Sequence, residues 1–272
     1  MLPHHLKKAS LNNIFIVIPM FGKASYTDAC IDSVVKNYGT GEPIEILVVD
    51  DGSEIPYLNP KVNVLRLDSN SGFTNASNQG ILWGQDRFDY VLLLNNDTIA
   101  QPGFLYELVQ VMSSDPSIGI AASIRVHPDR LPQNMELCGA DLIRGFQYFT
   151  DEKSLPDIPI EVNWIPLASG LLRMSMVREI GLLDKRFRNF CSDSDYCIRA
   201  KMNGWKVMMV ARSRVIHHLS VTTSASGVTA ESDQKKFLEK LAGLQYAELM
   251  KQMPLDGEAK TWGRFSFSVY EK

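Results

Sequence analysis

The chain has 272 residues, of which 45% are apolar and 22% are charged, and its formal net charge is -3. A chain of this length and composition can bury a large core, so we expect one large domain, or one domain with a small appendage. The charge balance gives no basic field across the sequence, and we therefore predict that nucleic acid is not a partner.

No segment of the sequence is apolar over a length that would cross a bilayer. The longest apolar stretch, Ile14 to Phe21, is far below the roughly 20 residues required. Residues 1–13 lack the pattern of an export signal, and the four cysteines form no CxxC pair. We expect reduced thiols and a cytoplasmic protein. Peripheral attachment at the inner face of the cell membrane stays open, because hydropathy does not reveal a surface-binding helix.

Strands and helices alternate along the first hundred residues. Continuous apolar runs predict strands, and apolar residues at helical spacing predict helices. The expected elements are strands at 14–18, 44–49, 62–67 and 90–94 and helices at 27–37 and 75–85. Because the strands are apolar on both faces, they predict a mostly parallel sheet with right-handed crossovers and helices on both faces. The fold class is therefore α/β.

The second half of the chain has sparser regular patterns. Residues 125–159 show little periodicity, which we interpret as an excursion beside the site. The other expected elements are a helix at 102–114, a strand at 118–123, an ordered stretch at 162–172, helices at 175–180 and 193–203, a strand at 206–210 and a long amphipathic helix at 232–253.

The second strand ends in paired acids. Asp50 and Asp51 follow it directly, and Gly52 and Ser53 then permit a sharp turn. A carboxylate at this place can accept hydrogen bonds from a base or a ribose. The structural alternative is an Asp-Gly turn with capping duties only. Since ligands of an open α/β sheet bind at the carboxyl ends of the strands, a second acidic strand end favours the functional interpretation.

That second acidic end follows the fourth strand, where Asn95, Asn96, Asp97 and Thr98 offer oxygen ligands. Such a loop suits Mg²⁺ or Mn²⁺ held against a diphosphate. Because only Asp97 is charged, the phosphates would supply the other anionic ligands. The structural alternative makes Asp97 or Thr98 the cap of a helix that begins at Pro102.

Small and amide residues occupy 70–80, at the start of the second predicted helix. Free N–H groups and the helix dipole favour an anion at such a place. Gly72 belongs to this stretch and is therefore a candidate binding residue. The amides of Asn75 and Asn78 could also face a sugar or a base.

Two later segments carry further candidates. Asp193 and Asp195 open a predicted helix, where acids are stabilised whatever their function, but either could also accept a proton from an attacking hydroxyl. His217 and His218 end a short strand, where an imidazole can complete a metal shell or hold a phosphate. A lone histidine is more often structural.

In this order the segments resemble the family 2 glycosyltransferases, which are inverting enzymes with the GT-A fold, and within them the bacterial rhamnosyltransferase-like branch. The resemblance covers about residues 12–220. The matching motifs are Ile18-Pro19-Met20-Phe21-Gly22, Val48-Val49-Asp50-Asp51-Gly52-Ser53, Asn70-Ser71-Gly72-Phe73 with Asn78-Gln79-Gly80, Leu94-Asn95-Asn96-Asp97-Thr98, Trp164 with Ser169-Gly170, Asp193-Ser194-Asp195-Tyr196-Cys197, and His217.

The resemblance implies a role for each motif. Asp193 would be the catalytic base, and Asp97 with His217 would hold Mn²⁺ or Mg²⁺ at the diphosphate. The nucleotide-sugar site would comprise Pro19 and Phe21 at the base, Asp51 at the base or ribose, Asp50 in support of that turn, and Gly72, Asn75, Asn78, Asn96 and Gly170.

The chain departs from the family pattern at three places. Ser192 stands where a Glu is usual, which makes Asp195 a competitor for the role of base. Asn95 stands where many relatives carry Asp. Leu219-Ser220 replaces a frequent Gly-rich continuation, so whether His217 or His218 faces the site stays open.

The resemblance also implies a function and an architecture. The expected protein is a metal-dependent inverting glycosyltransferase that moves a sugar from a dTDP- or UDP-linked donor to a saccharide or lipid-linked acceptor, in bacterial surface polysaccharide or lipopolysaccharide synthesis. Its Rossmann-like GT-A sheet would carry a C-terminal acceptor-side region. The expected divisions are an N-terminal extension (1–12), a nucleotide-sugar-binding half (13–124), an acceptor-binding and catalytic half (125–220), and a C-terminal helix and tail (221–272).

Three other functions compete with this one. A haloacid-dehalogenase-type phosphohydrolase would carry Asp-x-Asp after the first strand, whereas this strand ends in Pro19-Met20-Phe21. A sugar nucleotidylyltransferase would have a Gly-rich basic loop there, and only Lys23 is near. A catalytically inactive nucleotide-sugar-binding module is the third possibility, because Asn95 and Ser192 stand where relatives of the resembled family usually carry acids.

Overall fold

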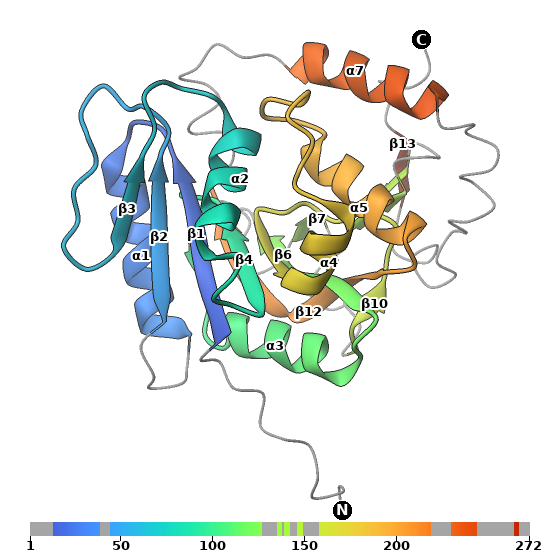
Figure 1. The fold of residues 1–272 in the computed structure, drawn as a ribbon. Helices are drawn as coiled ribbons and strands as arrows, with labels where there is room; N and C mark the ends of the chain where they lie inside the picture. Colours follow the sequence, from blue (N-terminus) through green and yellow to red (C-terminus); the bar gives the residue numbers. More distant parts are fainter. Residues whose placement is uncertain are drawn as a thin grey trace, which may run out of the picture.

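A computed structural model describes residues 13–38, 44–126, 158–218 and 230–243, together with the backbone of short strands at 135–137, 139–141, 146–148 and 264–266. A ten-stranded sheet forms the centre of this part of the molecule (Figure 1). Its main path runs in the order β10 (Ile160–Glu161), β12 (Lys206–His217), β6 (Ile118–Val126), β11 (Ser169–Arg173), β4 (Tyr90–Leu94), β1 (Ile14–Met20), β2 (Glu45–Asp50) and β3 (Asn63–Arg66). Two more strands extend it, since β5 (Thr98–Ala100) pairs with β12 and β7 (Met135–Leu137) with β6.

The strands β1, β2, β3 and β4 are mutually parallel neighbours, and β6 runs parallel to β12. Between these two groups, β11 lies antiparallel to both β4 and β6. The prediction of an α/β fold with a mostly parallel sheet is therefore confirmed. A separate sheet joins β13 (Arg264–Ser266), β9 (Phe146–Tyr148) and β8 (Gly139–Asp141).

Helices cover both faces of the large sheet (Figure 1). The apolar core of one face includes side chains from α1 (Ala24–Asn37) and α3 (Phe104–Ser114). The core of the other face includes α2 (Phe73–Gly84), α4 (Met174–Ile180), α5 (Ser192–Met202) and α7 (Ala230–Gly243). Strand β1 feeds both cores, because successive side chains of a strand point to opposite faces. Phe15 and Val17 pack in the second core, and Ile16 packs in the first.

The structure corrects several expected boundaries. The strand expected at 206–210 continues to His217 as β12, with an irregularity between Val210 and Arg214. Helix α3 begins at Phe104 after Gly103, and Thr98 belongs to β5, so the alternative that Asp97 or Thr98 caps this helix is wrong. Helix α7 ends at Gly243, and the rest of the helix expected over 232–253 lies outside the described residues. Within the described part, no helix combines the length and apolar character needed to span a bilayer.

Helix α2 lies so close to β1 that only glycine fits at one of its contact positions. A Cβ atom at Gly80 would stand 2.2 Å from Val17 Cγ1 in the buried core. We expect Gly80→Ala to lower the free energy of unfolding by about 1–3 kcal/mol, because the added methyl group overpacks this contact. Urea denaturation measures the change. The matched control on the same helix, Gln79→Ala, is expected to stay within about 0.5 kcal/mol of the wild type. An equal effect of the two variants would contradict this reason for the glycine.

Candidate active site

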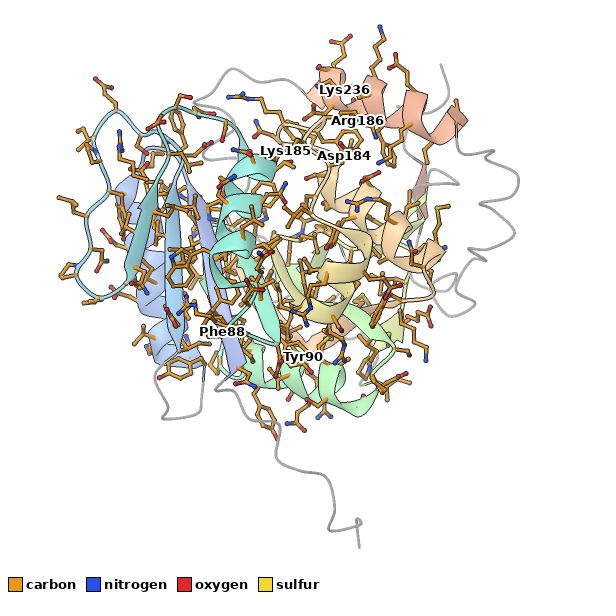
Figure 2. The ribbon with its side chains drawn as sticks, viewed as in Figure 1. Phe88, Tyr90, Asp184, Lys185, Arg186 and Lys236 are labelled. Carbon is orange, nitrogen blue, oxygen red and sulfur yellow. The ribbon has the colours of Figure 1, made fainter. Side chains whose placement is uncertain are left out.

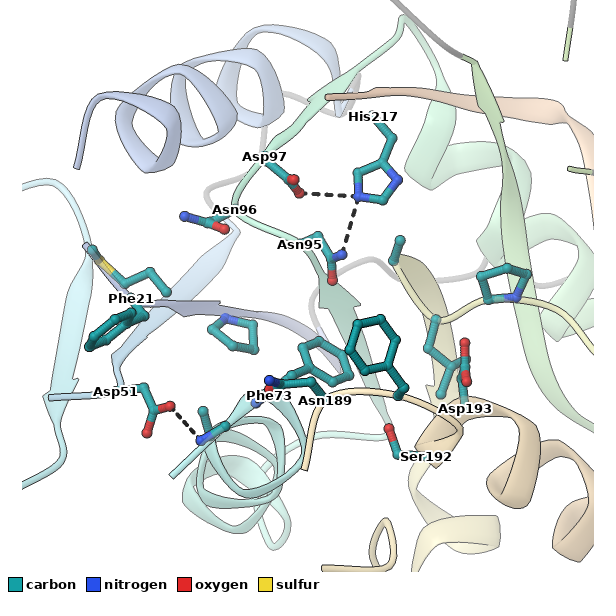
Figure 3. A pocket seen from close by; sticks show the side chains of 18 of the residues that line it. Phe21, Asp51, Phe73, Asn95, Asn96, Asp97, Asn189, Ser192, Asp193 and His217 are labelled. Carbon is teal, nitrogen blue, oxygen red and sulfur yellow. Dashed lines mark hydrogen bonds and ion pairs between the residues drawn. The ribbon is translucent and has the colours of Figure 1, made fainter. Parts of the chain in front are cut away.

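A cavity of about 260 Å³ opens where β1, β2 and β4 end (Figure 3). Its wall includes many of the residues singled out by the sequence: Pro19, Phe21, Asp51, Gly72, Asn96, Asp97, Asp193 and His217. Residues far apart in the chain are thus brought around one hollow. Asp50, Asn75, Asn78, Gly170 and Asp195 do not belong to this wall.

Asp51 holds the start of helix α2. Its Oδ1 accepts hydrogen bonds from the backbone N–H (2.8 Å) and the hydroxyl (2.6 Å) of Ser71, and its Oδ2 accepts one from Gly72 N at 2.7 Å. The anion at this helix start is therefore the protein's own carboxylate. A carboxylate oxygen has room for about two donors, so Oδ2 retains capacity for a donor from the cavity.

The next two N–H groups of α2 are also taken by the protein. Phe73 N donates to Asn189 Oδ1 at 2.9 Å, and Thr74 N donates to Arg188 O at 3.0 Å. The start of the helix is therefore joined to the loop that precedes α5.

Asp50 lies on the other side of the turn and is fully buried. It accepts hydrogen bonds from Ser53 N (2.9 Å), Tyr57 N (3.0 Å) and Arg66 Nη1 (2.5 Å). Burial alone would raise the pKa of Asp50, but these hydrogen bonds outweigh it and hold the pKa below its ordinary value. The structure thus gives Asp50 the support of the turn, and not contact with a ligand in the cavity.

Three other predicted binding residues have structural partners. Asn78 exchanges two hydrogen bonds with the backbone of Leu183, at 2.8 and 3.0 Å. Gly170 is an internal residue of β11, paired with Leu93 and Ala122. Asn75 Nδ2 donates to Ser71 Oγ at 2.9 Å. Asn78 and Gly170 thus have partners within the protein, Asn75 contacts the loop that Asp51 holds, and none of the three belongs to the cavity wall.

Strand pairing brings Asp97 and His217 together, because β12 pairs with β5 so that His217 stands opposite Thr98. His217 Nε2 lies 3.1 Å from Asp97 Oδ1 and 3.3 Å from Asn95 Nδ2. Figure 3 shows this group at one end of the cavity. His218 lines a separate small hollow beside Tyr26, so His217 is the imidazole that lines the large cavity.

The residues at this end of the cavity fit a divalent cation that shares its ligands with a bound anion. Among the described residues, no three His, Cys, Asp or Glu side chains form a metal-binding group. Asn95 Oδ1, however, is buried without a hydrogen-bond partner. Such an atom costs free energy unless a ligand satisfies it. Asn95 Oδ1, Asp97 and His217 could therefore hold Mn²⁺ or Mg²⁺ if oxygens of a diphosphate completed the shell.

Asp193 lies at a different part of the cavity wall, in the first turn of α5 (Figure 3). Burial raises the pKa of its carboxyl, and the Ser194 N–H and the charge of Arg125 offset only part of this effect. A raised pKa makes a carboxylate a better proton acceptor near neutral pH. The geometry and the electrostatics therefore both suit a general base.

Asp195 has other partners, although it lies only two residues further along. It is buried, and its carboxylate forms ion pairs with Arg199 Nε at 2.9 Å and with Lys240 of helix α7. The structure thus favours Asp193 over Asp195 as the base of the pair left open by the sequence.

Several wall residues were missed by the sequence reasoning. Arg125 lies in strand β6 but begins the stretch 125–159 that was expected to be an excursion, and its Nη1 lies 3.4 Å from His217 Nδ1. Asn189 and Phe190 stand in a loop without periodicity. Their place four and three residues before Asp193 was the one available signal.

The fold is that of the GT-A class of α/β proteins, as comparison with solved structures shows. A structure of GalNAc-T7 with UDP, GalNAc and Mn²⁺ matches 79% of this chain and 44% of that chain, with a TM-score of 0.60 and 17% identity. A structure of mannosyltransferase PcManGT from Pyrobaculum calidifontis with GDP-Man and Mn²⁺ matches 77% of this chain and 58% of that one, with a TM-score of 0.54 and 12% identity. At such identities the likeness shows the fold alone.

The chain belongs to glycosyl transferase family 2, whose family model matches residues 15–164. The resemblance to this family is therefore confirmed. O-antigen biosynthesis protein RfbC of Myxococcus xanthus is 25% identical over an alignment of 240 residues, and the match covers 79% of this chain and 18% of that protein. N-acetylglucosaminyl-diphospho-decaprenol L-rhamnosyltransferase of Mycobacterium tuberculosis is 24% identical over an alignment of 217 residues, and the match covers 68% of this chain and 69% of that protein.

Proposed function

We propose that this protein is a metal-dependent inverting glycosyltransferase that takes its sugar from a dTDP- or UDP-linked donor. The observation that carries the proposal is one cavity lined by Asp51, by Asp97 with His217, and by Asp193 (Figure 3). A nucleoside, a diphosphate and an acceptor hydroxyl each require a different kind of partner, and these three groups supply them. Membership of family 2 supports the same reaction class and gives no support to a phosphohydrolase.

The donor's nucleoside would lie at the ends of β1 and β2. Pro19 and Phe21 supply apolar surface for the base there, and Asp51 Oδ2 can accept a hydrogen bond from the base or the ribose. Asp97, His217 and Asn95 would hold Mn²⁺ or Mg²⁺, which stabilises the charge that builds on the departing diphosphate.

Asp193 would accept the proton of the acceptor hydroxyl. The oxygen of that hydroxyl then attacks the anomeric carbon of the sugar from the face opposite the nucleotide. The bond from this carbon to the diphosphate oxygen breaks, and its electron pair leaves with the nucleoside diphosphate. One displacement of this kind inverts the anomeric carbon. The raised pKa of Asp193 supports its part in the reaction, because it strengthens the carboxylate as a base.

The acceptor in this proposal is a saccharide or a lipid-linked sugar in bacterial surface polysaccharide or lipopolysaccharide synthesis. The names of two relatives support it, since one acts in O-antigen biosynthesis and the other is an L-rhamnosyltransferase. A cytoplasmic location with peripheral attachment to the membrane belongs to the same proposal. So does the division into a donor half (13–124) and an acceptor half (125–220).

A donor screen tests the proposed function. We expect one dTDP- or UDP-sugar, with Mn²⁺ or Mg²⁺, to raise the melting temperature by several degrees and to be hydrolysed slowly without acceptor. The matched control is the same sugar without its nucleotide, which should do neither. Failure of every donor in both assays would contradict the proposal. Binding of a donor without hydrolysis or transfer would instead leave the inactive nucleotide-sugar-binding module.

A further inference from the structure

The loop of residues 188–190, which leads into helix α5, forms part of the cavity wall through Asn189 and Phe190. It is fixed from the side of the cavity by helix α2. Besides the hydrogen bonds from Phe73 N and Thr74 N, Arg188 Nη2 donates to Asn70 O at 2.8 Å and to Asn70 Oδ1 at 2.6 Å.

The approach of this loop to helix α2 is very close. A Cβ atom at Gly72 would stand 2.5 Å from Arg188 Cγ and 2.7 Å from Arg188 O. Gly72 also has a φ of 92°, which favours glycine. The motif glycine is thus explained by the seating of loop 188–190, and a small shift of the loop changes the wall of the cavity.

From the outside, a single carboxylate of helix α7 fixes the same loop. Asp233 Oδ2 accepts hydrogen bonds from three consecutive backbone N–H groups, those of Arg188 (2.9 Å), Asn189 (2.9 Å) and Phe190 (3.1 Å). Asp233 is only 2% exposed, and its other oxygen pairs with Lys236 at 3.1 Å. Burial would raise the pKa of Asp233, but the three N–H groups and Lys236 hold it below its ordinary value.

Helix α7 is itself firmly seated on this part of the molecule. The ring of Phe237 packs edge to face on Phe187, with centroids 6.1 Å apart. Lys240 Nζ pairs with Asp184 Oδ2 at 2.8 Å, and Lys236 Nζ donates to the backbone oxygen of Arg186 at 2.8 Å. Figure 2 shows Asp184, Arg186 and Lys236 close together beside α7. These contacts hold helix α7 against the segment that leads into loop 188–190.

The backbone between loop 188–190 and Asp193 has little conformational freedom, so a shift of the loop would also displace Asp193. Cys191 has a φ of 62°, a left-handed conformation that costs free energy for any residue with a side chain. Such a conformation persists only where neighbouring contacts impose it. Asp233 fixes the residue just before it, and helix α5 begins just after it.

We propose that Asp233 is a positioning residue: it holds loop 188–190 against helix α2 and thereby fixes Asp193 opposite the donor side of the cavity. This inference rests on the proposed function, and it deepens it by making helix α7 part of the catalytic architecture. Helix α7 lies outside residues 15–164, the part of the chain that the family model matches.

Amide hydrogen exchange tests, without any substrate, whether Asp233 holds loop 188–190. In Asp233→Ala we expect the amides of residues 188–190 to exchange at least about tenfold faster than in the wild type, because all three lose their acceptor. Asp233→Asn keeps an oxygen for these amides but loses the charge, so its exchange should be intermediate. The matched control Lys236→Met removes the ion pair with Asp233 Oδ1 and the hydrogen bond to Arg186 O, but it leaves Asp233 Oδ2 with its three amides. The amides of residues 188–190 should therefore exchange in this variant as in the wild type. Unchanged exchange in a folded Asp233→Ala or Asp233→Asn variant would contradict the claim that Asp233 holds loop 188–190.

Kinetics with the donor found by the screen test the catalytic part. We expect Asp233→Ala to lower kcat about 100-fold with KM for the donor changed less than about threefold, since a displaced base slows the chemical step and leaves donor binding intact. Partial rescue by Asp233→Asn, and wild-type kcat in Lys236→Met, complete the expected pattern. A faster amide exchange with unchanged kcat would overturn the positioning role. A wild-type protein without donor binding or turnover would overturn the proposed function instead, whatever the exchange shows.

Discussion

Asp193→Asn is expected to lower kcat for sugar transfer by about 10²–10⁴-fold while leaving the Kd of the donor within about threefold of the wild type. The substitution keeps the shape of the side chain but removes the only group in our mechanism that accepts the proton of the acceptor hydroxyl. Donor binding should survive, because Asp51, Asp97 and His217 line other parts of the cavity. Steady-state kinetics and calorimetric titration of the donor measure the two quantities.

The pH dependence gives the same prediction a second measurement. Because burial raises the pKa of Asp193, the carboxyl remains protonated at pH values where an ordinary aspartate has already ionised. A protonated carboxyl cannot accept the proton of the hydroxyl, so kcat should fall as the pH drops through this raised pKa. The acid limb of the wild-type profile should therefore lie above the ordinary pKa of Asp, about 3.9, and be absent from the residual activity of Asp193→Asn.

Asp195→Asn is the matched control, since it makes the same chemical change two residues away. Loss of the buried pairs with Arg199 and Lys240 should lower the free energy of unfolding by roughly 3 kcal/mol. The kcat of the folded variant should remain close to that of the wild type. The opposite pattern, in which Asp195→Asn loses turnover with its stability intact and Asp193→Asn retains turnover, would make Asp195 the base.

Asp97→Ala is expected to raise the Kd of the donor about 10- to 100-fold in the presence of Mn²⁺ or Mg²⁺. In the presence of a chelator, the variant and the wild type should bind the donor with similar affinity, because Asp97 acts on the diphosphate through the cation. Calorimetric titration of the donor with and without metal measures this difference.

His218→Ala serves as the control for that titration. It removes an imidazole adjacent in sequence that lines the neighbouring hollow instead of the large cavity, so its donor affinity should match that of the wild type in both conditions. An equal loss of affinity in Asp97→Ala with and without metal would show that Asp97 does not act through a cation.

The parallel half of the sheet could be predicted from the sequence because its strands are buried on both faces. The runs at 14–18, 44–49 and 90–94 correspond closely to β1, β2 and β4. Strand β12 was expected to be shorter, since the exposed Arg212 and the partly exposed Arg214 interrupt its apolar pattern. The short β5 has three residues and carries no pattern long enough to recognise.

Sequence patterns located the acidic clusters of the site but could not separate neighbours within a cluster. Asp50 and Asp51 are adjacent, and only the observed turn shows that one is buried on Arg66 while the other lines the cavity. Two residues along a helix rotate by about 200°, so Asp193 and Asp195 point in nearly opposite directions. The place of Asp233 depends on a contact across more than forty residues, which no local pattern records.

The hydrogen bonds between the Asp51 carboxylate and the start of helix α2 have a consequence for selectivity between a nucleotide-sugar donor and inorganic phosphate. The positive end of this helix is already neutralised from within, so a free phosphate ion gains nothing by lodging there. In the proposed complex, compensation for the donor's pyrophosphate would come instead from Arg125, from His217 and from the proposed cation, at another part of the cavity wall. A ligand would then bind well only if it carried both a nucleoside and a pyrophosphate, because each of these groups would contact a different part of the cavity wall.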